Sequence, residues 1–334
     1  MHKVDPEEMP SLEAAAHGII LGNRSLEGDV SCASSQRSGE AKRVFPNTSK
    51  GFEQLTAWLK NRHAADVHIC MEATGAYWEA LAVYLHELKH RVSVVNPARI
   101  KAFAQSELLR TKTDAVDAAL IARFCRSQVP EAWIPPAPEI RILQALMRHY
   151  EHLKTTRAQQ SVYAQSSEAA VVTDSIREVI ATLDEQIAQV ERKIRQHFDD
   201  HPNLKRRRDL LTSIPGIGET TAGSILSEIP HLDRFQSAKA VAAFAGLSPR
   251  ERRSGTSIHG RPRLCKTGNS RVRKALYMPA IVALRFNPTL RVFAERLLAA
   301  GKHKRLIIGA VMRKLLVLAY GILRSGVAFD ANYA

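Results

Sequence analysis

Apolar residues recur with two different periods along the chain, and the alternation between these periods predicts its secondary structure. Phe52, Leu55 and Leu59 are three to four residues apart, which is the spacing of one helix face, and an N-cap signal precedes them at 47–49. Strand, helix, strand and helix follow in that order, which predicts an α/β domain with parallel pairing. These predicted elements are a strand at 65–72, a helix at 75–90, a strand at 91–97 and a helix at 111–126.

A long helical segment is predicted at 139–198, after the proline-rich punctuation at 135–139. Within it, Ile176, Leu183 and Val190 are seven residues apart, which is close to a heptad repeat. Three heptads are the lower limit of a coiled-coil signal. A coiled coil between subunits and a helical hairpin within one chain are therefore both consistent with this pattern.

The pattern changes again near 204, where two helices surround "IPGIG" and further helices follow to about Arg324. By contrast, residues 1–44 are rich in Ser and Gly and show no sustained period. We therefore expect an N-terminal domain at 1–134 whose first 44 residues are irregular or degraded. A helical, coiled-coil connector at 135–203 and a mainly helical domain at 204–330 complete the expected organisation.

Charge is divided unequally between the two parts of this 334-residue chain, whose formal net charge is +15. Residues 201–334 contain 24 Lys and Arg against 7 Asp and Glu, whereas residues 1–200 contain 24 against 26. A concentrated basic field attracts polyanions and gains free energy when their counterions are released. Nucleic acid is the partner that this distribution favours, although a basic protein without such a role shares the same composition.

Other sequence features argue against a membrane or secreted protein. No run of 18 or more apolar residues is present, so we expect no membrane span. The acidic N-terminal segment lacks the apolar stretch of a secretory signal. The four cysteines are scattered without zinc-type spacing, which favours reduced thiols in the cytoplasm.

Three acids form the first candidate site. Glu72 ends the strand predicted at 65–72, and ligands of open α/β sheets gather at that edge. Asp114 and Asp117 are three residues apart, so their carboxylates share one helix face. Mg²⁺ would turn their mutual repulsion into coordination and could assist displacement at phosphate. A solvent-facing pair of acids, balanced by neighbouring basic residues, is the alternative.

The second candidate site is the "IPGIG" turn, which resembles a helix-hairpin-helix motif. Gly216 and Gly218 permit a tight turn, and N–H groups at the next helix N-terminus can receive a phosphate. Arg206 and Arg207 lie just upstream. An ordinary helical hairpin turn is the alternative, but the neighbouring basic residues favour a contact with the nucleic-acid backbone.

The third candidate site is the basic stretch 249–274, which has nine Lys and Arg and one acid, and which its glycines are expected to break into loops. Ser254 or Ser257 could attack a phosphodiester there, because guanidinium groups would stabilise the developing charge. Hydroxyls that only hydrogen-bond to phosphate are the simpler interpretation of the spacing. The nucleic-acid-binding residues expected here are Arg250, Arg252, Arg253, Arg261, Arg263, Lys266 and Arg271.

Six ordered blocks give the chain a specific resemblance to a known family. It resembles the insertion-sequence transposases of the IS110 family, in its eleven-eleven branch, from about Phe45 to Arg324. The blocks are "FPNTSKGFEQLTAWL", "ICMEATGAYWEALA", "VSVVNPARIKAFAQS", "RTKTDAVDAALIARF", "LTSIPGIGETTAGSILSEI" and "FAGLSPRERRSGTSIHGRPRLCKTGNSRVRKALYMPA".

The resemblance implies an RNase H-like (RuvC-like) N-terminal domain with a D-E-D-D set of Mg²⁺-binding acids, and a C-terminal transposase domain with a nucleophilic serine. It also implies a DNA recombinase that is guided by a structured RNA, assembles as dimers or tetramers and works in the prokaryotic cytoplasm at the nucleoid. The matching positions are Glu72, Asp114 and Asp117 for three acids and Ser254 for the serine, with Ser257 its nearest competitor.

The chain departs from the family pattern in its opening strand and in the strand that follows, and the pattern returns only at about 39–45. The first acid of the set is expected in the opening strand, where this chain has Ile20; Asp29 is the nearest substitute. Two other functions therefore remain open. One is a metal-dependent nuclease resembling a junction resolvase, which would cleave without a covalent intermediate. The other is a catalytically inactive remnant that binds nucleic acid.

Overall fold

The computed structural model describes residues 15–22, 29–36, 39–61, 67–73, 75, 77–109, 113–167, 169–232, 235–254 and 258–331. Within these ranges only the backbone is described at 15–42, 114–115, 251–254 and 258–262. The chain forms two compact units, Met1–Pro135 and Pro136–Ala334.

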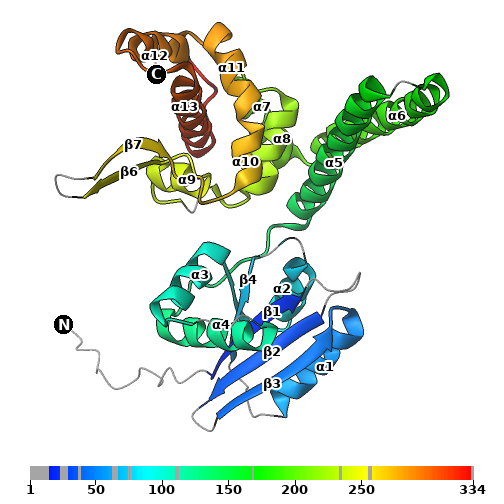
Figure 1. Ribbon diagram of the computed structural model, residues 1–334, viewed down its shortest axis with the longest axis vertical. Coiled ribbons are helices and arrows are strands. Elements are labelled where there is room, and N and C mark those ends of the chain that lie inside the picture. Colours follow the sequence, from blue (N-terminus) through cyan, green and yellow to red (C-terminus); the bar gives the residue numbers. More distant parts are fainter. Residues whose placement is uncertain are drawn as a thin grey trace. The chain divides into compact units, whose positions relative to one another are not determined.

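The N-terminal unit is built on one five-stranded mixed sheet with the order β3-β2-β1-β4-β5 (Figure 1). β2 pairs antiparallel with both β1 and β3, whereas β4 pairs parallel with both β1 and β5. The expected parallel pairing of the two predicted strands, now β4 and β5, is thus confirmed. The strands are β1 (Ala15–Gly22), β2 (Asp29–Gln36), β3 (Gly39–Pro46), β4 (Val67–Glu72) and β5 (Arg91–Val95).

The expectation that residues 1–44 are irregular is wrong for the described part of that segment. All of its described residues belong to three paired strands, β1, β2 and β3. Their polar, Ser-rich sequences lack a clear two-residue period, but a strand in a sheet is also held by backbone hydrogen bonds to its neighbours. Pairing with the buried strand β4, a tertiary feature, therefore overrides the weak local signal.

Two helical layers cover the sheet, and the side chains of β4 alternate between them. Ile69 and Met71 are buried in the layer that includes residues of α1 and α2. Cys70 is buried in the other layer, among residues of α3 and α4. These helices are α1 (Ser49–Lys60), α2 (Trp78–Glu87), α3 (Pro97–Ser106) and α4 (Asp114–Gln128).

The C-terminal unit is mainly helical, with one two-stranded antiparallel ribbon. Its helices are α5 (Pro138–Ser166), α6 (Ala170–Asp200), α7 (Pro202–Thr212), α8 (Glu219–Glu228), α9 (Ala238–Phe244), α10 (Ser270–Ala275), α11 (Tyr277–Phe286), α12 (Pro288–Ala299) and α13 (Lys304–Ser325). The ribbon consists of β6 (Pro249–Ser254) and β7 (Ile258–Leu264).

The long helical segment forms a hairpin within the chain, which is one of the two arrangements that the heptad pattern allowed. α5 and α6 pack side by side and project from the rest of the C-terminal unit (Figure 1). Tyr150 of α5 donates a hydrogen bond of 2.9 Å to Glu191 of α6. Further out, Arg157 forms a bidentate pair with Asp184, with N···O distances of 2.9 and 3.2 Å. The heptad residues Ile176 and Val190 are buried.

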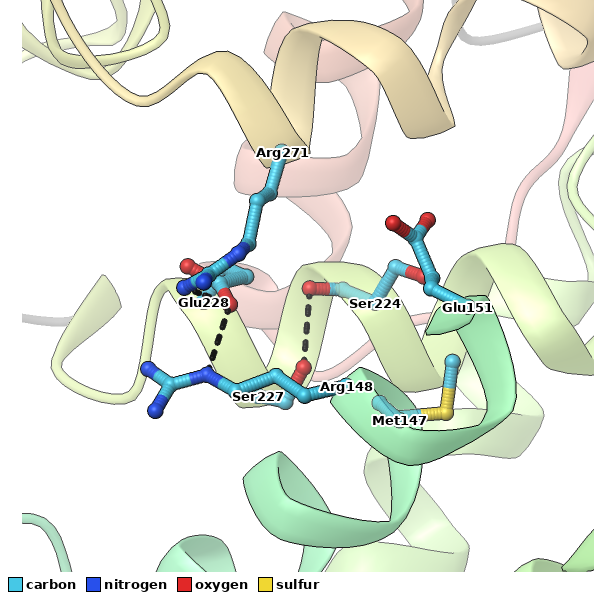
Figure 2. Close-up of a pocket in the computed structure, with 7 residues that line it drawn as sticks. All are labelled: Met147, Arg148, Glu151, Ser224, Ser227, Glu228 and Arg271. Carbon is cyan, nitrogen blue, oxygen red and sulfur yellow. Dashed lines mark hydrogen bonds and ion pairs between the residues drawn. The ribbon is translucent and has the colours of Figure 1, made fainter. Parts of the chain in front are cut away.

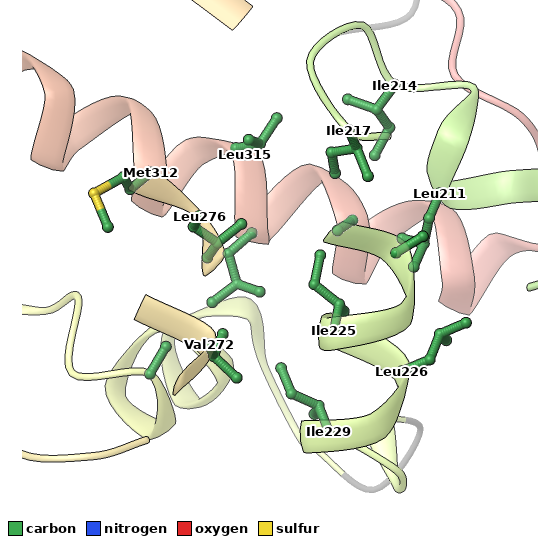
Figure 3. Close-up of a cluster of buried hydrophobic side chains, with 14 of the residues drawn as sticks. Leu211, Ile214, Ile217, Ile225, Leu226, Ile229, Val272, Leu276, Met312 and Leu315 are labelled. Carbon is green, nitrogen blue, oxygen red and sulfur yellow. The ribbon is translucent and has the colours of Figure 1, made fainter. Parts of the chain in front are cut away.

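One core holds the C-terminal unit together, and it includes the inner half of the hairpin. Figure 3 shows part of this core, where Leu211, Ile225 and Leu315 come from α7, α8 and α13, and Leu276 lies between α10 and α11. Among the described residues, α13 is the one helix long and apolar enough by length and composition to cross a bilayer. Half of its most apolar window is buried inside the protein, which explains its apolar character as that of a core helix.

The turn between α7 and α8 contains the two glycines of "IPGIG", which have different local roles. Gly216 has a φ of +109°, and a Cβ there would lie 2.7 Å from the Cβ of Ala283 on α11. Gly218 is the exposed N-cap of α8, and a Cβ there would meet nothing within 4 Å. Gly216 is therefore required for the backbone conformation and for close packing, whereas Gly218 leaves the helix N-terminus open.

The packing of the hairpin onto the core yields a prediction at two adjacent residues of α5. Leu143 is fully buried, whereas the neighbouring Ile142 is 52% exposed. We expect Leu143→Ala to lower the free energy of unfolding by about 2–5 kcal/mol, because it leaves a cavity in the core. Ile142→Ala should lower it by less than about 1 kcal/mol. Urea denaturation of both variants measures the difference, and equal losses would contradict the described packing.

The glycine turn yields a second prediction. Gly216→Ala should destabilise the protein by at least about 2 kcal/mol, because the new methyl group combines a strained φ with a close contact to α11. Gly218→Ala should cost less than about 1 kcal/mol, since only the cap preference changes. Thermal unfolding of the two variants provides the comparison. A Gly216→Ala variant as stable as the wild type would show that the turn can relax.

Candidate functional site

Glu72 lies at the carboxyl end of β4, on the sheet face that α4 covers. It is half-buried, and the alternation along β4 places it on the same side as Cys70. Asp117 is half-buried in the first part of α4, one turn before the buried residues Leu120 and Ile121. The fold thus assigns Glu72 and Asp117 to the same face of the N-terminal unit.

The start of α4 is fixed by Thr113, whose hydroxyl accepts a hydrogen bond from the amide of Val116. Asp114 is therefore the first residue of the helix, but its side chain lies outside the described part of the structure. Among the side chains that the structure describes, no group of three His, Cys, Asp or Glu residues could hold a metal ion. Carboxylate oxygens suit Mg²⁺, so the donor types fit the ion, while the complete set stays a prediction.

The register between β1 and β4 identifies the residue that lies beside Glu72 on the neighbouring strand. Ile19 on β1 pairs with Met71 on β4, so the next residues, Ile20 and Glu72, are level in two parallel strands. Asp29 pairs with Gly22, two residues further along β1 and on the far strand β2. Strand spacings place the Cα atoms of Asp29 and Glu72 about 12 Å apart, against about 5 Å for position 20. Position 20 is therefore the geometrically suitable place for a further acid.

A polar cluster beneath Glu72 was not expected from the sequence. The Nε2 atom of buried His68 lies 2.8 Å from the hydroxyl of Ser93, which in turn donates to the carbonyl oxygen of Glu131 at 2.8 Å. Cys70 and Cys125 are both buried, and hydrogen bonding to Cys125 together with burial raises the pKa of the Cys70 thiol. These contacts connect β4, β5 and α4, the elements that carry or support the acids.

The basic stretch 249–274 forms a ribbon followed by a helix, so the expectation that its glycines break it into loops is wrong for residues 249–254 and 258–264. β6 and β7 pair antiparallel, with one irregularity between Arg250 and Arg252. Alternating apolar residues are scarce here, but the two strands still satisfy each other's backbone groups. Ser254 is the last residue of β6, opposite Ile258, whereas Ser257 lies outside the described residues.

The basic residues of the ribbon are placed as follows. Arg250 and Arg263 are paired across the two strands, and both side chains are exposed. Arg252, Arg253 and Arg261 belong to the same two strands, but their side chains lie outside the described part. Two like charges directly opposite each other on a ribbon repel unless an anion lies between or near them.

Residues around the α7–α8 turn differ in exposure. Arg206 is exposed and lines an open groove with Lys205 and Asp209, whereas Arg207 is half-buried. Arg208 stacks over Phe198 at 5.3 Å and pairs with Asp209 at 2.8 Å, so it contributes to packing. Arg206 is thus the residue of this group best placed for a polyanion.

A carboxylate that sequence reasoning missed lies near the end of the basic stretch. Glu228 lies between Arg148 of α5 and Arg271 of α10, in a small pocket that Ser224 also lines (Figure 2). Lys266, which precedes Arg271 in the loop between β7 and α10, is exposed and has a φ of +58°. The sequence signal that could have revealed Glu228 is the rarity of acidic residues in this part of the chain, since residues 201–334 contain 7 acids against 24 Lys and Arg.

Comparisons with known proteins match both parts of the chain to transposase models. Residues 27–168 match the DEDD transposase family model of IS110-type elements, and residues 208–295 match the model described as transposase IS116/IS110/IS902 family. The chain is 39% identical to the pilin gene-inverting protein of Moraxella lacunata over 297 residues, covering 86% of this chain and 90% of that protein.

Two further relatives extend the comparison. The pilin gene-inverting protein of Moraxella bovis is 38% identical over the same shares of both chains. The transposase for insertion sequence element IS1328 of Yersinia enterocolitica is 23% identical, covering 94% of this chain and 98% of that protein. The two matched models and the near full-length relatives lead to one conclusion: this chain belongs to the IS116/IS110/IS902 family of transposases.

Proposed function

We propose that this transposase cuts and joins DNA through Ser254, with Glu72, Asp114 and Asp117 as ligands of Mg²⁺ and a structured RNA as guide. The observation that carries the proposal is the position of Glu72, at the end of a central strand and on the face covered by the helix that begins with Asp114. Membership of the transposase family makes DNA the substrate.

The strand order supports an RNase H-like assignment for the N-terminal unit. Three antiparallel strands followed by two parallel ones, with helices on both faces, give a mixed sheet whose central strands β1 and β4 are neighbours. The carboxyl edge of β4 and the start of α4 lie on one side of that sheet. Mg²⁺ bound there would act as a Lewis acid that stabilises negative charge on the scissile phosphate.

The serine step follows from elementary phosphoryl chemistry. The Oγ of Ser254 attacks the phosphorus and loses its proton to solvent or to a nearby base, so that an Oγ–P bond forms. The bond from phosphorus to the leaving deoxyribose oxygen breaks, and that oxygen takes up a proton. Attack by a hydroxyl of another strand reverses these changes and joins the strands. The guanidinium groups on β6 and β7 would neutralise the added charge.

The turn between α7 and α8 supports a helix-hairpin-helix contact to the nucleic-acid backbone. The exposed N-cap at Gly218 leaves the first turn of α8 accessible, and exposed Arg206 belongs to α7, on the other side of the same hairpin. Backbone contacts of this kind hold nucleic acid without reading its sequence. A guide RNA that pairs with DNA would supply the sequence selectivity, and a dimer or tetramer would bring two DNA sites together.

The acid missing at position 20 yields a prediction about metal binding. We expect weak Mg²⁺ binding by the wild type and at least tenfold tighter binding by Ile20→Asp, because position 20 is level with Glu72. Adding Asp117→Asn to that variant should remove the gain. Isothermal titration with Mg²⁺ tests both expectations. Unchanged affinity in Ile20→Asp would place the metal ligands elsewhere.

The proposed nucleophile yields a second prediction. In the Ile20→Asp background, Ser254→Ala should abolish covalent protein–DNA adducts, since no other hydroxyl would occupy that place on β6. Ser257→Ala is the matched control and should retain them. Denaturing gels with end-labelled DNA and the folded RNA of the element report the adducts. If only Ser257→Ala removed them, the nucleophile would be Ser257.

The same gels separate the two competing functions. A metal-dependent nuclease gives cleaved DNA without an adduct in every variant. An inactive remnant gives salt-sensitive binding of DNA and RNA with neither cleavage nor adduct at any Mg²⁺ concentration. The missing acid at position 20 is the feature that supports the remnant, and its restoration in Ile20→Asp distinguishes a damaged transposase from a different enzyme.

A further inference from the structure

Glu228 is an acid in a strongly basic unit, and its side chain is only 9% exposed. It is the last residue of α8, the helix that follows the glycine turn. A carboxylate removed from water is unfavourable unless cations and hydrogen-bond donors surround it. Its partners therefore show what it holds together.

Three residues from two other helical regions surround the carboxylate. Asn269 donates a hydrogen bond of 2.8 Å from Nδ2 to Oε2 of Glu228. The other oxygen, Oε1, lies 3.7 Å from Nε of Arg148 on α5 and 3.6 Å from Nη1 of Arg271 on α10 (Figure 2). One carboxylate thus contacts the connector helix α5 and the segment that follows the ribbon.

The amide side chain and the backbone N–H of Asn269 all take part in hydrogen bonds. Its Oδ1 caps α10 by accepting from the amides of Arg271 and Val272, at 2.9 and 3.1 Å. Its own amide donates to the carbonyl of Phe244 at 2.7 Å. Because Nδ2 is bound to Glu228, Asn269 connects α8, α9 and α10 through one side chain and one peptide group.

The segments joined by Asn269 form the base of the ribbon. The amide of Cys265 donates to the carbonyl of Ser248, and that of Lys266 donates to Gly246. Gly268 packs so closely that a Cβ there would lie 2.2 Å from the carbonyl oxygen of Phe244. Both strands of the ribbon are therefore joined to a base that Asn269 links to Glu228 of α8.

We propose that Glu228 is a positioning residue, which acts through Asn269 to hold the β6–β7 ribbon in a fixed orientation relative to α5 and α8. The position of the ribbon follows from contacts described above, and its consequence for strand joining rests on the proposed role of Ser254. Glu228 takes no part in bond making. Its charge and its hydrogen bond fix where the base of the ribbon lies.

Three variants of the full chain separate this role from general stability. Asn269→Ser keeps an N-cap hydroxyl but is too short to reach Glu228. Glu228→Gln keeps an acceptor for Asn269 but removes the charge that faces Arg148 and Arg271. In the double variant E228Q/N269D the amide of Gln donates to the carboxylate of Asp, which reverses the direction of the hydrogen bond and returns one negative charge to the cluster. Asn96→Ser, which alters an exposed cap of α3 in the N-terminal unit, is the matched control.

The primary measurement is amide hydrogen exchange, which requires no catalytic activity. We expect Asn269→Ser and Glu228→Gln to speed exchange across the strands at 249–254 and 258–264 at least tenfold and to leave α13 unchanged. The double variant should return the ribbon to within threefold of the wild type, and Asn96→Ser should not affect it. Unchanged ribbon exchange in both single variants, or equal acceleration throughout the unit, would overturn the proposal.

Adduct formation in the Ile20→Asp background supplies the second measurement. The single variants should lower the rate of adduct formation at saturating DNA at least tenfold, while DNA affinity changes less than threefold, and the double variant should recover most of the rate. A loosened ribbon with a normal adduct rate would refute its role in positioning Ser254. If no adduct forms even in Ile20→Asp, the proposed chemistry fails, while hydrogen exchange still decides the structural role of Glu228.

Discussion

The two-residue period of β4 is the constraint on which the arrangement of the N-terminal unit depends. Both faces of this strand are covered, so successive side chains must enter different helical layers. Ile69 and Met71 fill one layer, and Cys70 fills the other. The same alternation carries Glu72 to the side of α4, where the chain also supplies Asp114 and Asp117. A shift of one residue in this strand would move Glu72 to the sheet face opposite α4.

The C-terminal unit is subject to a different constraint, because it must keep many cationic side chains at the surface of one apolar core. Its apolar helices, with α13 at the centre, bury the core and leave the cations on the ribbon, on α7 and on α10. The ribbon carries opposed arginines that a polyanion would stabilise. Against this background the buried carboxylate of Glu228 has an ordering role, because it fixes the base from which the ribbon extends.

The family comparison and the structure describe complementary aspects of the protein. The comparison covers both halves of the chain and establishes a transposase. The structure adds that the position of the absent acid, Ile20, is level with Glu72 across neighbouring strands, whereas Asp29 is two strands from Glu72. The register thus gives the expected first acid a defined place in the sheet, which Ile20 occupies in this chain.

The sequence by itself determined the features that depend on local periodicity and charge. The strands β4 and β5, the helices α1, α2 and α4, the long helical segment and the basic second half were all readable, because side-chain period and net charge are properties of consecutive residues. The pairing of β1, β2 and β3, the ribbon at 249–254 and 258–264, the choice of a hairpin within the chain and the Glu228–Asn269 contact were decided by the tertiary structure. Each of these depends on partners that are distant in sequence, whose backbone hydrogen bonds and buried charges can be satisfied only after the chain has folded.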